Sequence, residues 1–329
     1  ASEANTIIAE QRTRQILGIN ERLARMKGNR TDITVSSWLD KYELVQEERL
    51  KHNELRPNSF RQKAKPIRLF REHCGMQYLK DITALDISEI TDAVKAEGHN
   101  RMAQVVRMVL IDVFKEAQHA GHVPPGYNPA QATKQPRNKI SRQRLSLEEW
   151  KAIYTSAEQQ QPYLQCGMLL AIVTGQRLGD ICNMKFSDVW DDMLHIEQEK
   201  TGTRLAIPLS LRNEALNITL SDVISKCRDA VVSKYLVHFR HSTSQASRGD
   251  QVSAKTLTST FKKARDKSGL TWEEGTAPTF HEQRSLSERL YREQGIDTQK
   301  LLGHKTMKMT DRYNDDRGKE WIIVGKKAV

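Results

Sequence analysis

Long apolar runs and paired cysteines are missing from this sequence of 329 residues. A helix that spans a bilayer needs about 20 consecutive apolar residues, and the most apolar stretch, 168–173, is long enough only for a buried core helix. The cysteines Cys74, Cys166, Cys182 and Cys227 form no CxxC pair, which argues against a disulfide framework or a zinc site. The first residues also lack the charged-then-apolar pattern of a secretory signal. We therefore predict a cytoplasmic protein without membrane contact.

Motifs for nucleotide hydrolysis and for two-metal catalysis are missing as well. No GxxxxGK[ST] phosphate loop occurs, so nothing supports nucleotide hydrolysis. Two acidic pairs, Asp191-Asp192 and Asp315-Asp316, do not have the look of a two-metal nuclease site, and we interpret both as turn or cap residues. The sequence therefore predicts neither a bound metal nor a cofactor.

Positive charge is what the sequence has in excess. Lysine and arginine together number 52 against 41 acidic residues, which gives a net charge of +11 and an isoelectric point near 9.4. A surplus of this size points to a polyanionic partner, most often nucleic acid. The hydrophobic fraction of 38% is enough for ordinary globular cores.

Four regions divide the chain. Residues 1–30 are predicted to form an amphipathic coupling helix, which either packs on a neighbouring element or contacts DNA or another protomer. Residues 31–133 show helical periodicity throughout and predict a compact all-α domain, with helices over 35–48, from 57 onward, 86–96 and 100–120.

The third region, 134–144, is a basic interdomain linker without a single acidic residue. We predict that it lies extended along DNA phosphates, although a plain solvated linker has the same composition. Its candidate DNA-binding residues are Lys134, Arg137, Lys139, Arg142 and Arg144.

The fourth region, 145–329, mixes helices with two short strands. The strands, over 193–197 and 203–208, flank a hairpin turn that carries Lys200. Ser146 and Glu149 form a capping box at the first helix. The predicted helices span 147–157, 162–174, 211–229, 253–268, 281–294 and 297–302. The fold class is therefore mainly α with a small antiparallel β-sheet.

Polar motifs that suit phosphate chemistry follow one another in this fourth region. They are the segment TGQRLGD over 174–180, Lys200, HEQR over 281–284, LLGHK over 301–305, and Tyr313 nine residues beyond His304. Each has an ordinary explanation on its own. Arg177 suits a surface ion pair, His304 a core histidine near a helix end, and Tyr313 a half-buried packing residue. Their conjunction in this order is what argues for a site.

This order of Arg, Lys, His-x-x-Arg, Leu-Gly-His and Tyr resembles the tyrosine recombinase, or phage integrase, family. The wider stretches TFHEQRSLSERLY over 279–291 and YNDDRGKEW over 313–321 resemble its lambda-like branch in particular. The resemblance implies a helical core-binding domain and a catalytic domain that close as a clamp around duplex DNA. Members of that branch begin with a small arm-binding domain. This chain opens within what resembles the coupling helix, so we expect it to lack most of that domain.

The residue types themselves suit metal-free transfer of a phosphodiester. Two guanidiniums, from Arg177 and Arg284, can each fork onto nonbridging oxygens and keep their charge at neutral pH. A phenol such as that of Tyr313 can form an ester that is displaced later. Because a free phenol has a pKa near 10, Tyr313 needs a neighbouring acceptor or positive field.

The resemblance implies a role for each remaining motif residue. Tyr313 is the nucleophile that leaves a 3′-phosphotyrosine, and His281 is the candidate base. Lys200 is the candidate proton donor to the departing 5′-hydroxyl, and His304 is expected to donate a hydrogen bond to the phosphate. Asp180 is expected to orient one of the basic partners.

The resemblance also implies an assembly on DNA. Four protomers would act on two duplexes through a Holliday junction to integrate or excise phage DNA in the bacterial host, with a host DNA-bending protein and an excisionase as candidate further partners. The segment 321–324 is expected to pack on a neighbouring protomer, or else to add a strand to its own sheet. The alternatives are a non-catalytic architectural DNA-binding protein, or the same chemistry in conjugative transposition or in relaxation by a type IB topoisomerase.

Overall fold

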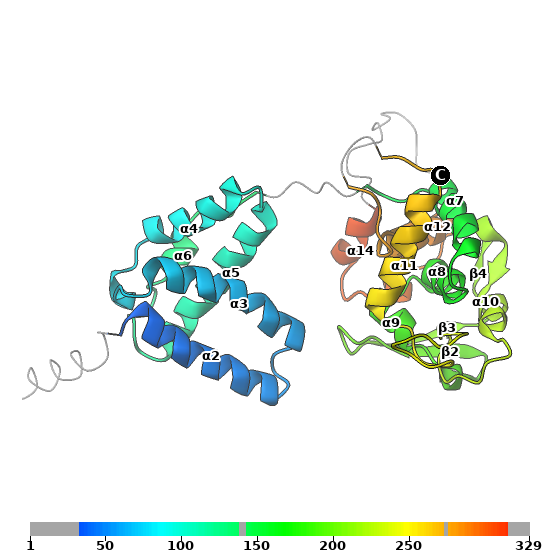
Figure 1. Ribbon diagram of the computed structural model, residues 1–329, viewed down its shortest axis with the longest axis horizontal. Coiled ribbons are helices and arrows are strands. Elements are labelled where there is room, and N and C mark those ends of the chain that lie inside the picture. The colour runs from blue at the N-terminus through cyan, green and yellow to red at the C-terminus, as the bar shows by residue number, and fades with distance from the viewer. Residues whose placement is uncertain (1–32, 138–142, 273–275, 315–329) are drawn as a thin grey trace, which may run out of the picture. The chain divides into compact units, whose positions relative to one another are not determined.

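The computed structural model describes residues 33–137, 143–272 and 276–314. The chain divides into two compact units, Ala1–Ile140 and Ser141–Val329, and the change of unit falls inside the predicted basic linker (Figure 1). Both units are rich in helix, and the named strands of the described residues all belong to the second unit. The predicted fold class is thereby confirmed. Among the described residues, none of the helices is both long and apolar enough to cross a membrane.

The first unit is a bundle of helices whose starts follow local capping chemistry. Thr34 accepts a hydrogen bond from the Ser37 backbone N–H at the first helix, and Thr83 and Asp86 form a capping box at the third long helix. Gly121, at φ +72°, follows the last long helix. The elements are α2 (Val35–Lys51), α3 (Pro57–Cys74), η1 (Leu79–Asp81), α4 (Ala84–Ala96), α5 (Asn100–His119) and α6 (Pro129–Ala132).

An apolar core joins the helices of this unit, and a polar network lies beside it. Trp38, Phe70 and Phe114 are almost fully buried, and the rings of the two phenylalanines lie 5.9 Å apart. Beside this core the Lys63 ammonium, on α3, donates to the Tyr42 hydroxyl on α2 at 2.7 Å and to the Asp112 carboxylate on α5 at 2.5 Å. The network therefore ties three helices together.

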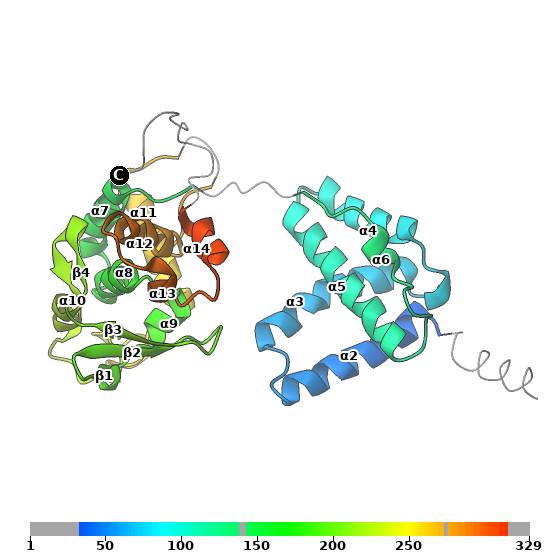
Figure 2. The ribbon, with the colours of Figure 1, turned by 180° about the vertical axis from the view of Figure 1, so that it is seen from behind.

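The second unit is built around one buried helix. In α8 every residue except Gln165 is buried, because the helix is apolar on all sides. The helices α10, α11 and α12 pack around it (Figure 2). The helices of this unit are α7 (Leu147–Ser156), η2 (Ala157–Gln159), α8 (Tyr163–Thr174), α9 (Leu178–Asn183), η3 (Phe186–Asp188), η4 (Glu214–Leu216), α10 (Leu220–Cys227), α11 (Ala254–Lys267), α12 (Glu282–Glu293), α13 (Thr298–Leu302) and α14 (Met307–Asn314).

A three-stranded antiparallel sheet in the order β1-β2-β3 lies at one side of this unit. Its strands are β1 (Val189–Trp190), β2 (Met193–Glu197) and β3 (Arg204–Pro208), and a separate pair is formed by β4 (Arg212–Asn213) and β5 (Ile218–Thr219). The pairing of His195 with Ala206 confirms the predicted hairpin, with Lys200 in its turn. Asp191 and Asp192 have φ of 48° and 54° in the β1–β2 turn, as predicted for turn residues.

The predicted helix over 211–229 is wrong. This segment contains β4, η4, β5 and only then the short helix α10. Asn217 adopts the left-handed conformation at φ 52°, which interrupts any helix. Thr219 and Asp222 then form a capping box that starts α10.

The other predicted helices within the described residues agree with the structure within a few residues, whereas α6, α9 and α14 were not predicted. The Ser146–Glu149 capping box is confirmed at α7. The predicted helix over 1–30, the predicted strand over 321–324, and Lys139 and Arg142 lie outside the described residues.

Candidate active site

Arg177 lies at a sharp reversal between two helices. The helix α8 ends at Gly175, whose φ of +64° turns the chain, and Arg177 is the N-cap residue of α9. Its Nη1 donates to the Gln198 side-chain oxygen at 2.7 Å, and it lies 3.9 Å from the Asp180 carboxylate. The side chain remains 18% exposed, so it is not closed off from solvent.

Arg284 is held deep in the same region by backbone carbonyls. It projects from α12 and is 1% exposed. Its Nη1 donates to the Gly175 carbonyl at 2.6 Å, and its Nη2 donates to the Leu302 carbonyl at 2.7 Å and contacts His304 Nε2 at 3.1 Å. Among the described residues its Nε has no hydrogen-bond partner. A fixed cation that keeps N–H donors without a partner is suited to bind an anion.

Burial and neighbouring cations set the charge of the two buried groups. Burial lowers the pKa of Arg284 to about 10, so the guanidinium stays protonated at neutral pH. Burial, together with the charges of Arg284 and Arg177, lowers the pKa of His304 to about 4. His304 is therefore neutral at pH 7.

The hydrogen bonds of His304 define its tautomer. Because a guanidinium can only donate, Nε2 accepts from Arg284 and the ring proton sits on Nδ1. The Nδ1–H then donates to the Thr310 hydroxyl, with 2.9 Å between the two atoms. Both ring nitrogens are thus engaged within the protein, Nε2 by Arg284 and Nδ1 by Thr310.

Tyr313, near the end of α14, lies against these groups. Its ring centre is 5.5 Å from the Arg284 guanidinium carbon and 5.3 Å from the His304 ring centre, on which it stacks. The exposed His281, at the N-cap of α12, lies 6.1 Å away, ring centre to ring centre. The phenol ring of Tyr313 therefore lies beside one guanidinium and two imidazole rings.

Two hydrogen bonds to backbone carbonyls attach the end of α14 to the rest of the site. The Ser285 hydroxyl donates to the Tyr313 carbonyl at 2.7 Å. Arg144 donates to the Arg312 carbonyl at 2.5 Å and forms an ion pair with the Glu282 carboxylate at 3.1 Å. Arg144, a predicted DNA-binding residue, thus contacts the helix that carries the tyrosine. Its side chain is only 11% exposed.

Asp180 is hydrogen-bonded to the turn that carries Lys200. Lys200 is exposed in the β2–β3 turn. Asp180, on α9, is buried and its Oδ1 accepts the backbone N–H of Glu199 at 2.9 Å. Asp180 thereby anchors the turn that carries Lys200 while its other oxygen faces Arg177.

Of the other predicted DNA-binding residues, the structure describes Lys134 and Arg137, which belong to the first unit. Lys134 and Arg137 are exposed and line a cavity of about 860 Å³ together with the α4 residues Leu85, Ser88 and Lys95.

Four polar residues that contact this site were missed by the sequence reasoning. They are Gln176, Gln198, Ser285 and Thr310. Gln176 and Ser285 lie beside Arg177 and Arg284 in sequence, and Gln198 lies two residues before Lys200. Position next to a motif residue was the available signal, but it does not separate these residues from other polar neighbours.

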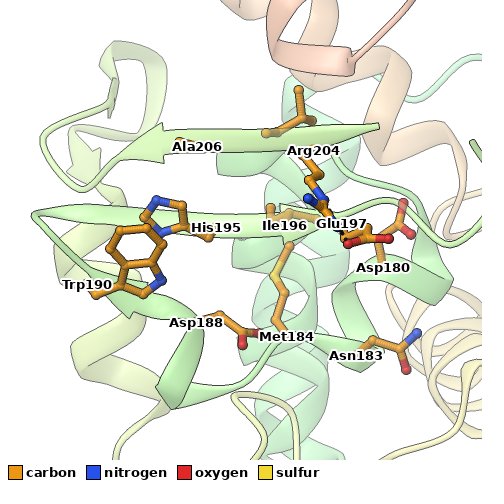
Figure 3. A pocket seen from close by; sticks show the side chains of 11 residues that line it. Asp180, Asn183, Met184, Asp188, Trp190, His195, Ile196, Glu197, Arg204 and Ala206 are labelled. Atoms are coloured by element: carbon orange, nitrogen blue, oxygen red, sulfur yellow. Dashed lines mark hydrogen bonds and ion pairs between the residues drawn. The ribbon is translucent and has the colours of Figure 1, made fainter. Parts of the chain in front are cut away.

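A second hollow of about 510 Å³ lies along the sheet (Figure 3). Trp190 stacks flat on His195 at 3.5 Å, and the Arg204–Glu197 ion pair lies farther along, toward Asp180. Of the predicted site residues, Asp180 alone lines this hollow in the described part of the chain.

A helical unit followed by a mixed unit with this cationic tyrosine site defines the class of tyrosine recombinases. The comparisons agree. The model of the phage integrase family matches residues 143–320. The chain is 81% identical to an integrase of Enterobacteria phage P21, over 100% of this chain and 86% of that protein. It is 63% identical to the prophage integrase IntE of Escherichia coli K12, over 98% of this chain and 86% of that protein.

Solved structures of phage lambda integrase are also similar. A lambda integrase dimer bound to a COC′ core site matches with a TM-score of 0.81 and 36% identity, over 93% of this chain and 84% of that one. A lambda integrase tetramer bound to a Holliday junction matches with a TM-score of 0.80 and 36% identity, over 89% and 80%. The chain belongs to the phage integrase family. It is a site-specific DNA recombinase of the tyrosine type.

Proposed function

We propose that this recombinase cleaves and rejoins phage attachment-site DNA with Tyr313 as its nucleophile. The observation that carries the proposal is the convergence on one phenol of the buried Arg284 guanidinium and the rings of His304 and His281. A phenol with no part in the reaction has no need of a buried cation with an unused donor. The observation therefore favours catalysis over a purely architectural role.

In the proposed reaction the Tyr313 hydroxyl oxygen attacks the scissile phosphorus. A bond to this oxygen forms while the bond from phosphorus to the 5′-oxygen breaks, which leaves a 3′-phosphotyrosine and a 5′-hydroxyl. His281 takes the phenol proton, and Lys200 gives a proton to the departing oxygen. The 5′-hydroxyl of the partner duplex then attacks the phosphotyrosine. Each ester replaces another, so the bond energy is conserved.

The arginines stabilise the charge that develops on the nonbridging oxygens. Arg177 offers the guanidinium of a side chain that is 18% exposed, and Arg284 offers its Nε–H, which has no partner among the described residues. His304 supports Arg284 by accepting its hydrogen bond, and it can donate to the phosphate only after a proton reaches Nε2. Asp180 keeps the Lys200 turn close to Arg177.

We further propose that the two units close as a clamp on double-stranded DNA, with the linker residues Lys134, Arg137, Lys139, Arg142 and Arg144 near phosphates. The net charge of +11 supports this. By analogy with the lambda integrase structures, the active form is a homotetramer on a Holliday junction. The segment 321–324 is then exchanged between protomers, and a host DNA-bending protein and an excisionase are further partners in the host cytoplasm.

Covalent trapping tests the proposed reaction. Protein is incubated with nicked duplexes tiled across the DNA beside its gene, with EDTA present, and adducts are resolved in SDS. We expect a protease-sensitive adduct from the wild type and none from Tyr313→Phe. The matched control is Tyr154→Phe, since Tyr154 is a half-buried tyrosine of the same unit that stacks on Trp150. It should keep the adduct.

Three results would contradict the proposal. They are an adduct from Tyr313→Phe, salt-sensitive binding by the wild type without any adduct, and an adduct that requires magnesium. Strand exchange between two cognate duplexes, compared with relaxation of a supercoiled plasmid, separates recombination from topoisomerase activity.

A further inference from the structure

Gln198 is a fully buried amide that uses both its ends. It follows β2 directly and is 0% exposed. Its side-chain oxygen accepts from Arg177 at 2.7 Å and from the Thr201 hydroxyl at 2.8 Å. Its side-chain nitrogen donates to the Gln176 side-chain oxygen at 2.7 Å and to the Leu302 carbonyl at 3.0 Å. A single side chain therefore links three segments that are far apart in the sequence.

We propose that Gln198 is a positioning residue that holds Arg177 in the direction of the scissile phosphate. The inference rests on the proposed function, in which Arg177 contacts that phosphate. Gln198 acts through Arg177 and does not itself touch the DNA. Its hydrogen bond to the guanidinium is charge-assisted, and bonds of this kind are stronger than neutral ones.

The Leu302 carbonyl connects this anchor to the second arginine. It accepts from Gln198 at 3.0 Å and from Arg284 at 2.7 Å. Gln198 therefore fixes Arg177 to the same carbonyl oxygen that fixes Arg284. The relative positions of the two guanidiniums are set by this shared acceptor, and two cations aimed at one phosphate need such a fixed spacing.

The backbone next to Leu302 is shaped to admit Gln198. Gly303 has φ +64°, and a Cβ atom at this position would lie 2.9 Å from the Gln198 side-chain nitrogen. A glycine is therefore needed here both for its conformation and for the close approach of the amide. The same turn carries His304, so Gln198 also supports the segment that presents this imidazole.

Gln198 also keeps Arg177 from pairing with the Asp180 carboxylate. Asp180 Oδ2 lies 3.9 Å from the Arg177 guanidinium, and among the described residues this oxygen has no hydrogen-bond partner. Without the amide oxygen of Gln198, Arg177 would turn toward this carboxylate and pair with it. A guanidinium paired with Asp180 contributes less charge to the phosphate.

The test compares two substrates that differ only in the charge of the scissile phosphate. One is the natural phosphodiester, and the other is a methylphosphonate in which a methyl group replaces a nonbridging oxygen and removes the charge. The rate of covalent adduct formation at saturating DNA is measured for the wild type, Arg177→Ala and Gln198→Met. The ratio of the two rates does not depend on the fraction of folded enzyme.

We expect Gln198→Met to cleave the phosphodiester about 10- to 100-fold more slowly than the wild type, the range set by one hydrogen bond to a charged group. On the methylphosphonate the loss should largely disappear, as it should for Arg177→Ala, and the double variant should match Arg177→Ala alone. Gln198→Glu, which places a carboxylate against Arg177 and loses the donor to Gln176 and Leu302, should not recover the rate on the phosphodiester.

The matched control is Gln46→Met in the first unit. Gln46 is also buried, at 1% exposure, and its oxygen accepts from the Lys63 ammonium at 2.9 Å. It should cleave both substrates at the wild-type ratio. An equal loss by Gln198→Met on both substrates, or a double variant well below Arg177→Ala, would overturn the inference. Absence of any adduct from the wild type would instead overturn the proposed function.

Discussion

A histidine that is neutral at pH 7 has a different chemistry from a charged one. His304 sits between two arginines and beneath the ring of Tyr313, and its pKa of about 4 follows from burial and from those two cations. At neutral pH it accepts a hydrogen bond from Arg284. His304 therefore orients the Arg284 guanidinium and adds no positive charge to those of Arg177 and Arg284.

The same pKa predicts how stability depends on pH. In the unfolded chain a histidine titrates near 6.5, so between pH 6.5 and 4 the unfolded state binds more protons at His304 than the folded state. The free energy of unfolding should therefore fall as the pH is lowered through this window, by on the order of 3 kcal/mol from this residue. The contribution is fully present above pH 6.5.

Denaturant unfolding at several pH values measures this effect. His304→Gln should show a flatter pH dependence between 6.5 and 4 than the wild type. His241→Gln is the control, because His241 is exposed in the same unit, and it should keep the wild-type slope. An NMR titration that gives His304 a pKa at or above 6.5 would refute this prediction.

At the scale of elements, α14 packs on α12 and α13, and polar groups fix its end. Among its residues with described side chains Thr310 is the buried one, and Met307 and Met309 are largely exposed. Polar groups hold it instead: Ser285 and Arg144 bind the carbonyls at its end. The position of the nucleophile therefore depends on hydrogen bonds more than on apolar packing.

Removing one of these bonds should slow cleavage even at saturating DNA. Arg144→Met should lower the single-turnover rate of adduct formation about tenfold at saturating DNA, because it loses a charge-assisted bond to the Arg312 carbonyl. Arg204→Met, which breaks an exposed ion pair with Glu197, should leave the rate unchanged. If the dissociation constant rises while the saturated rate stays at wild type, Arg144 acts on DNA phosphates and not on α14.

Elements with local signals could be predicted, and those with tertiary causes could not. The Ser146–Glu149 capping box and the strongly apolar segment of α8 could each be recognised from a few consecutive residues. The helix α14 lacks an apolar face, so its periodicity gave no signal. The error over 211–229 has a local cause, since the Thr219–Asp222 box could have marked the start of α10.

The site was predictable as a set of residues but not as a network. The motif order singled out Arg177, Arg284, His304 and Tyr313, which the structure brings together. Gln198 was not singled out, because its partners at 176–177 and 302 are distant in sequence and meet only in the fold. Spacing along the chain carries no information on such contacts.

At the scale of the whole molecule, the charge predicts a strong dependence of DNA binding on salt. Each phosphate contact contributes about −0.9 to the slope of log K against log salt concentration. Lys134→Gln and Arg137→Gln should each reduce the magnitude of this slope by about 1, measured by fluorescence anisotropy with attachment-site DNA. Arg204→Gln is the control, because its guanidinium lies outside the linker and already pairs with Glu197 at 3.1 Å. Unchanged slopes for both linker variants would mean that the linker residues are merely solvated.

The close fit of Gly303 against Gln198 has a consequence for how this sequence can diverge. Any side chain at 303 meets the amide of Gln198 at 2.9 Å, in a backbone conformation that side chains rarely adopt. A larger residue at 303 is tolerable only with a smaller residue at 198, and that exchange gives up the anchor of Arg177. As long as Gln198 is kept, position 303 is therefore held to glycine, although a long stretch of chain separates the two.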